Sequence, residues 1–231
     1  MVPVGKAQPK WLLVVLLLGS AATVYFLLSR LEYVMPFSQI PAVLCLPSCS
    51  DIESIHPAIA TEDYLNTNRP LADLISAEIP EEIQKEKVSL LIEKGEYRVT
   101  VFYELQPIKA YDSVFGTEPE GDKRREGDRK TPEGVFRVRD LYPHEQWSKF
   151  IWLDYPTPHS WRKHLKAKMQ GEVGLLSTVG SEVGIHGVSS GAESLIEQRT
   201  DWTWGCISLK NADVDEIYEV VTQGTVVEIV P

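Results

Sequence analysis

From residue 87 onward, the chain alternates apolar and polar positions in the way expected of β-strands. Two such runs, residues 88–93 and 97–103, flank a short turn-forming segment, residues 94–96. One face of the second run is apolar or aromatic, with Tyr97, Val99, Val101 and Tyr103 at alternate positions. We therefore expect a β-hairpin with one buried face.

The rest of this region favours a mainly β domain with two helices. Further strands are predicted at residues 108–115, 135–139, 150–153, 183–186 and 225–230. A basic helical segment is predicted at 160–169. A late helix begins near Asn211, whose side chain is a good N-cap, and ends at Gly224. Its apolar positions keep helical spacing at Val214, Ile217, Tyr218 and Val221.

The N-terminal pattern is different, because residues 11–28 contain no charge. As a helix this run would span roughly 27 Å, enough for the hydrocarbon core of a bilayer. Lys6 and Lys10 precede it, which favours a cytoplasmic N-terminus. We expect residues 1–30 to be a membrane anchor, although a signal peptide cleaved near residues 20–22 is the alternative. Both interpretations place residues 31–231 outside the cytoplasm.

Residues 31–86 are rich in proline and have no sustained periodicity, which indicates a spacer between the anchor and the domain. Short helices are predicted at 61–65 and 71–77. Cys45 and Cys49 lie four positions apart in an oxidising compartment, so a local disulfide is expected. Together with His56 they make a poor metal site, because no fourth ligand is nearby.

The net charge of −10 argues against nucleic acid as a partner, since binding by counterion release needs an excess of Lys and Arg. The basic segment 160–169 is the local exception. It is either a solvated helix face or a contact with an acidic polymer or phospholipid.

Cys206 is the strongest candidate for chemistry. It follows Gly205, and His186 lies nineteen intervening residues before it. A thiol attacks a carbonyl as its thiolate, and a free cysteine is only a few per cent ionised at neutral pH, so a nearby imidazole base matters. The pair indicates an acyl-transfer enzyme, whereas a buried apolar cysteine is the alternative.

Several motifs in residues 87–231 together resemble the YkuD-type catalytic domain of bacterial L,D-transpeptidases. Besides the opening hairpin, they are the Gly127-Asp128-Arg129-Lys130-Thr131-Pro132-Glu133-Gly134 loop, Ile185-His186-Gly187, Thr203-Trp204-Gly205-Cys206, Asn211, Asp213, and the terminal Gly224-Thr225 strand. The resemblance implies a curved β-sandwich with a helical insertion and a late helix. It also implies a peptidoglycan stem peptide as substrate. Nothing in the sequence indicates a metal or an organic cofactor.

Carried over by position, Cys206 resembles the nucleophile and His186 the base. The carbonyl of Gly187 would orient the imidazole, and Gly205 would let the backbone approach the substrate closely. Backbone N–H groups at and beside Cys206 would form the oxyanion hole. Candidate substrate contacts are Thr203, Trp204, Ser208 and Tyr155.

Two positions differ from many members of the family: Trp204 replaces a histidine, and Ser208 replaces an arginine suited to a carboxylate. Lys210 or the basic segment could compensate. The variant at residues 202–208, with Leu153-Asp154-Tyr155-Pro156 upstream, looks closest to the YafK-like branch, which includes hydrolases of a stem–protein linkage.

Three functions therefore stay open. They are transfer of a stem peptide to an amine, including that of a wall-attached protein; hydrolysis by a carboxypeptidase or amidase of the same family; and non-catalytic wall binding. The expected location is the inner membrane, with the domain in the periplasm.

Overall fold

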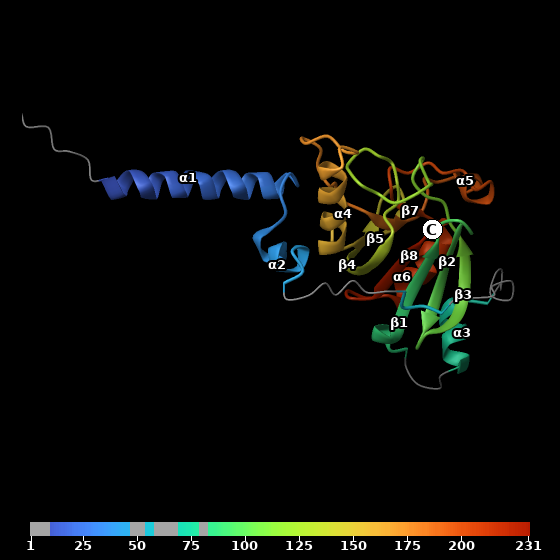
Figure 1. Cartoon of the computed structure of the whole chain (residues 1–231). Helices are drawn as coiled ribbons and strands as arrows, with labels where there is room; N and C mark the ends of the chain where they lie inside the picture. The colour runs from blue at the N-terminus through green and yellow to red at the C-terminus, as the bar shows by residue number, and fades with distance from the viewer. Residues whose placement is uncertain (1–9, 47–53, 58–68, 79–82) are drawn as a thin grey trace, which may run out of the picture.

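Strands from both halves of the domain combine into one curled sheet (Figure 1). The computed structural model describes residues 10–46, 54–57, 69–78 and 83–231. Within these residues the sheet has eight strands in the order β3-β2-β1-β8-β4-β5-β6-β7. Their bounds are β1 Val88–Glu93, β2 Arg98–Tyr103, β3 Gln106–Asp112, β4 Gly134–His144, β5 Ser148–Leu153, β6 Gly184–His186, β7 Ile207–Ser208 and β8 Val226–Val230.

The helices lie around this sheet and N-terminal to it. They are α1 Lys10–Arg30, α2 Ile40–Val43, α3 Leu71–Glu78, α4 Pro158–Met169, α5 Ser194–Glu197 and α6 Asn211–Val220, with 3₁₀ turns η1 Phe37–Gln39 and η3 Lys85–Lys87.

The predicted hairpin is confirmed as the antiparallel pair β1–β2, with Leu90 opposite Val101. The expectation of one buried face is wrong, because every residue of β2 is buried. His56, from the segment before the domain, covers the second face, and its ring centroid lies 4.5 Å from that of Phe102. A distant segment therefore decides the burial of this strand.

The sheet curls because β4 changes partner along its length. Its first half pairs with β8 and its second half with β5, across a bulge between Val138 and Asp140. Such a bulge bends a strand and increases its twist. Val114, just after β3, exchanges two 2.9 Å hydrogen bonds with Ser208 of β7, so the two sheet edges meet. The expected curved, mainly β fold is thus a single curled mixed sheet.

Helix α6 begins at Asn211 as predicted and buries Val214, Ile217 and Val220. The prediction that Asn211 caps this helix is wrong, since Lys210 is the N-cap residue and its side chain forms no capping bond. The end is also earlier than expected, because Val221 is already extended, before Gly224.

Helix α1 occupies the predicted anchor segment and extends away from the sheet (Figure 1). Many of its large apolar side chains are exposed, such as Leu16 and Phe26. In the part of the chain that the structure describes, no helix combines the length and hydropathy needed to cross a membrane. The anchor stays a prediction.

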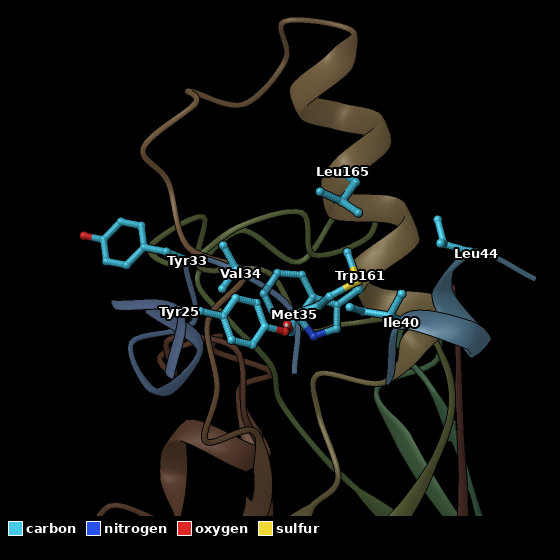
Figure 2. A pocket seen from close by; sticks show the side chains of 8 residues that line it. All are labelled: Tyr25, Tyr33, Val34, Met35, Ile40, Leu44, Trp161 and Leu165. Carbon is cyan, nitrogen blue, oxygen red and sulfur yellow. Dashed lines mark hydrogen bonds between the residues drawn. The ribbon is translucent and has the colours of Figure 1, made fainter. Parts of the chain in front are cut away.

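After α1 the chain turns back against α4. Figure 2 shows side chains of both segments around an apolar pocket of about 270 Å³, lined by Tyr25, Tyr33, Val34, Met35, Ile40, Leu44, Trp161 and Leu165. Two basic residues of α4 form contacts within the protein. Arg162 donates to the carbonyl of Ala42 at 2.7 Å. Lys163 pairs with Asp122. A contact of α4 with an acidic polymer or phospholipid stays a prediction.

Parts of the predicted spacer pack on the domain. The helix expected at 71–77 is confirmed as α3, and its Leu71 and Ile75 are buried in the core. The helix expected at 61–65 lies outside the described residues. Cys45 is disulfide-bonded, as expected, while Cys49 also lies outside the described residues.

Candidate active site

His186 ends strand β6, and Cys206 lies immediately before the neighbouring parallel strand β7. In the register of β6 and β7, His186 pairs with Ser208, and Cys206 is two residues before Ser208. Because residues in register on neighbouring strands share a face, His186 and Ser208 lie on the same face of the sheet. The register therefore brings the end of β6, with His186, beside the segment that carries Cys206.

The tautomer of His186 follows from its hydrogen bond. Its Nδ1 lies 2.7 Å from the carbonyl oxygen of Gly187. Since a carbonyl oxygen only accepts, Nδ1 carries the proton and Nε2 keeps a free lone pair. This is the contact that the resemblance implied for Gly187, and it leaves Nε2 as the basic atom.

Aromatic rings enclose the imidazole. The His186 ring centroid lies 4.3 Å from that of Trp147, 5.8 Å from Phe150 and 5.5 Å from Trp202. Burial lowers the pKa of His186 to about 4, although the bond to Gly187 acts in the opposite direction. The imidazole is therefore neutral at physiological pH.

Asn211 holds the segment that follows His186. Its Oδ1 accepts the N–H of Val188 at 2.9 Å. A β-carbon at Gly187 would lie only 2.0 Å from this oxygen and 2.6 Å from the carbonyl of Trp147, so the position requires glycine. Ser208 Oγ also donates to the carbonyl of Gly187, at 3.2 Å. These contacts position the oxygen that orients the imidazole.

Cys206 keeps a free thiol and is half-buried, with Sγ 3.5 Å from the carbonyl oxygen of Glu182. Burial raises the pKa of Cys206 to about 11. The backbone N–H of Gly184 and the charge of Lys123 lower this pKa, whereas the charge of Glu182 raises it. Both the thiol and the imidazole are thus neutral in the resting site.

The turn before the nucleophile is closed by Thr203. Its Oγ1 donates to the carbonyl of Cys206 at 2.7 Å and accepts the N–H of Gly205 at 3.1 Å. Gly205 has a φ of +132°, and a β-carbon there would lie 2.7 Å from the carbonyl of Lys130. Glycine therefore allows the loop at 127–134 to pack directly against the turn.

The four candidate substrate contacts occupy different environments. Thr203, Ser208 and Tyr155 are buried, and their hydroxyls all bond within the protein. Trp204 is 78% exposed, with the Arg129 guanidinium 5.9 Å from its ring centroid. A direct contact with substrate stays a prediction for all four, and the exposure supports it best for Trp204.

The sequence did not identify two residues of the site, Trp147 and Lys123, and it matched Asn211 to the family without giving it a role in the site. Asn211 lies five residues after Cys206, but its position at a helix start suggested a cap. Lys123 lies in a polar loop that gave no sign of burial. Lys210, considered as a substitute for the missing arginine, pairs with Glu197 at 2.8 Å. Across the described ranges, no group of three His, Cys, Asp or Glu side chains could hold a metal ion.

Comparison with known proteins identifies the domain. Residues 87–229 match the model of the YkuD family, the L,D-transpeptidase catalytic domain. No curated protein matches the chain at a significant level.

Several solved structures are similar. The helical cell shape determining protein Pgp2 from Campylobacter jejuni is 24% identical, with a TM-score of 0.45, over 68% of this chain and 53% of that one. Bd1075 from Bdellovibrio bacteriovorus is 18% identical, with a TM-score of 0.43, over 63% and 48%. An L,D-transpeptidase from Enterococcus faecium is 17% identical, with a TM-score of 0.41, over 63% and 50%. This chain thus spans about half the length of these proteins. The family match covers more than half of the chain, which therefore belongs to the YkuD family of L,D-transpeptidase catalytic domains.

Proposed function

We propose that this protein is a peptidoglycan-acting cysteine acyl-transferase of the L,D-transpeptidase type. One observation carries the proposal: His186, fixed with its Nε2 unprotonated by the carbonyl of Gly187, ends the strand next to β7, which Cys206 immediately precedes. Non-catalytic wall binding would not require an oriented imidazole beside the segment that carries a free thiol.

The first half-reaction forms a thioester. As Cys206 Sγ attacks the carbonyl between the third residue of a tetrapeptide stem and its terminal D-alanine, its proton passes to His186 Nε2. The C=O electron pair moves to oxygen, then returns as the C–N bond breaks. D-Alanine leaves with the proton from His186. In the second half-reaction an amine of another stem or of a wall-attached protein attacks the thioester, and His186 accepts its proton.

The pKa values decide when the thiolate forms. A thiol with a pKa of about 11 is ionised in roughly one molecule in 10⁴ at pH 7, so the resting enzyme holds almost no thiolate. Proton transfer must therefore accompany attack. An oxyanion donor typically contributes about 10²–10³ in rate. The N–H of Gly205 is already bonded to Thr203, so we assign this part to the N–H of Cys206.

Acylation by a carbapenem tests the enzyme proposal. We expect the intact mass to increase by one adduct, on the peptide that contains Cys206. Cys206→Ala abolishes the adduct, and His186→Gln slows its formation by at least about 10²-fold, the usual contribution of a general base. Absence of an adduct on the folded wild-type protein would contradict the proposal and favour a binding role.

Digestion of purified wall sacculi separates transfer from hydrolysis. Transfer predicts new cross-linked stems together with released D-alanine. Release of tripeptide stems or of a wall-attached protein, without cross-links, would instead assign the hydrolase alternative. The hydrolase alternative is supported by the resemblance to the YafK-like branch, which rests on residues 202–208 and 153–156.

We further propose that the domain acts in the periplasm and that α1 attaches it to the inner membrane. The exposed apolar side chains along α1 support this location, which also places the enzyme beside its substrate. Membrane fractions washed with alkaline carbonate provide the test. Retention of the full chain, and its release after deletion of residues 1–30, is expected; recovery of the intact chain in the wash would exclude the anchor.

A further inference from the structure

Lys123 is a buried cation beside the nucleophile turn. Its side chain is 4% exposed, although it belongs to a polar loop. A β-carbon at Gly205 would lie 3.6 Å from its Nζ. The ammonium therefore lies against the backbone of the residue that precedes Cys206.

Asp128 holds this ammonium in place. Its Oδ1 accepts from Lys123 Nζ at 2.9 Å and from the N–H of Lys130 at 3.2 Å. Its Oδ2 accepts the N–H groups of Arg124 and Arg125 at 2.7 and 2.9 Å. Four donors thus share the charge of one carboxylate, and within the described residues the ammonium forms this one hydrogen bond.

The site requires a fixed positive charge. During attack, negative charge develops on the sulfur and then on the carbonyl oxygen, but the His186 imidazole is neutral at the start. The carboxylate of Glu182, also near the sulfur, opposes ionisation of the Cys206 thiol. The phenol of Tyr142 nearby is neutral and does not offset this charge. A cation in a desolvated site acts strongly on nearby charge.

We propose that the ammonium of Lys123 stabilises the negative charge formed at Cys206 during acylation. The inference rests on the proposed function of Cys206 as the nucleophile. Lys123 neither gives nor takes a proton: the thiol proton moves to His186 Nε2, and the ammonium stays charged throughout. Asp128 restrains it and partly cancels its field.

The rate of Cys206 alkylation by iodoacetamide reports the thiolate population without any wall substrate. The rate is measured on the full chain between pH 7 and 9. We expect Lys123→Gln to slow alkylation at least about tenfold, because a nearby opposite charge typically shifts a pKa by about one unit or more. Lys123→Arg retains the charge, and we expect its alkylation rate to lie within about threefold of the wild-type rate. Arg125→Gln, which removes an exposed charge from the same loop, leaves the rate within about twofold.

Asp128→Asn gives the decisive sign. If the lysine acts through its charge, removing the opposing carboxylate speeds alkylation. If the ion pair serves folding alone, a folded Asp128→Asn protein alkylates at the wild-type rate, whereas loss of structure exposes the thiol, lowers its pKa and speeds alkylation in both variants; either outcome would overturn the proposal. An unchanged rate in a folded Lys123→Gln protein would also overturn it. Should Lys123→Gln fail to fold, the sign for an Asp128→Asn protein whose melting temperature is unchanged decides. Failure of carbapenem to acylate the wild type would instead count against the proposed function, and the alkylation comparison would still measure the effect of Lys123.

Discussion

The side-chain oxygen of Asn211 accepts the N–H of Val188, 23 residues earlier in the sequence, at 2.9 Å. This bond joins the start of α6 to the segment that leaves β6. Gly187 lies between Val188 and His186, and its carbonyl oxygen orients the imidazole. The geometry of the base therefore depends on a residue that does not contact it.

Asn211→Leu removes this acceptor and leaves the buried N–H of Val188 unpaired. We expect a loss of about 1–3 kcal/mol in the free energy of unfolding. We also expect a lower kcat with little change in KM, because His186 loses its orientation. Asn211→Asp keeps an oxygen acceptor and is the matched control. Equal activity of the two variants would show that the bond does not position the base.

Gly187→Ala tests the close packing around the same carbonyl. Because the added β-carbon would lie 2.0 Å from Asn211 Oδ1 and 2.6 Å from the carbonyl of Trp147, backbone must move. We expect a clear fall in melting temperature and at least about 10²-fold slower carbapenem acylation. Gly95→Ala is the control, since its β-carbon meets neighbours no closer than 3.8 Å. Acylation at the wild-type rate in Gly187→Ala would refute the assignment of the Gly187 carbonyl as the group that orients the His186 imidazole.

The fall in the acylation rate at acid pH, the acid limb of the pH profile, reports the pKa of His186. With its pKa lowered to about 4 by burial, the imidazole stays a base across neutral pH. We expect the rate of acylation to fall only as the pH approaches 4. Trp147→Ala opens one side of the ring and moves this limb upward, toward the ordinary histidine pKa of about 6.5. Trp11→Ala, remote and 64% exposed, is the control. A limb that does not move would mean that Trp147 does not desolvate the base.

Thr203→Val removes a hydroxyl that serves two backbone groups of the nucleophile turn. The N–H of Gly205 and the carbonyl of Cys206 would both lose a partner. We expect about 1–3 kcal/mol of destabilisation and slower acylation of Cys206. Thr203→Ser retains the hydroxyl and is expected to recover most of both properties. Rapid acylation of a folded Thr203→Val protein would exclude this role.

Glu228 binds the segment at 54–57 to the back of the sheet. Its Oε2 accepts the N–H groups of Ile55 and His56 at 3.0 and 2.9 Å and lies 2.7 Å from His56 Nδ1. Burial raises the pKa of Glu228, but bonds from Ser54, His56 and Ile55 outweigh it and the net pKa is lowered. The stabilisation is therefore complete above the ordinary carboxyl pKa of about 4.3 and is lost as the pH falls through the lower folded value.

Glu228→Gln is accordingly expected to destabilise the protein by about 1–3 kcal/mol at pH 7, with the difference from wild type shrinking below about pH 4. Chemical unfolding at several pH values measures this. Glu104→Gln, which breaks an exposed ion pair with Lys87, is the control and costs less than about 1 kcal/mol. A difference that is independent of pH would show that the carboxylate charge is not involved.

Much of the fold could be predicted from local pattern. The β1–β2 hairpin, the strands around Phe150 and Ile185, and α6 all follow from alternation, turn residues and helical spacing, which act between neighbours in the sequence. The motifs around His186 and Cys206 likewise identified the family, because the turn at Gly205 and the base need fixed residue types at fixed spacing.

The tertiary structure decided the rest. Strand order brought β6 beside β7, and packing enclosed His186 among three aromatic rings from two distant segments, Trp147 with Phe150 and Trp202. It turned Asn211 from an expected cap into a support for the base, and it buried Lys123 beside Gly205. No local pattern carries this information. A hydrogen bond or a desolvated charge depends on which distant segments meet, and that is settled when the whole sheet curls and closes.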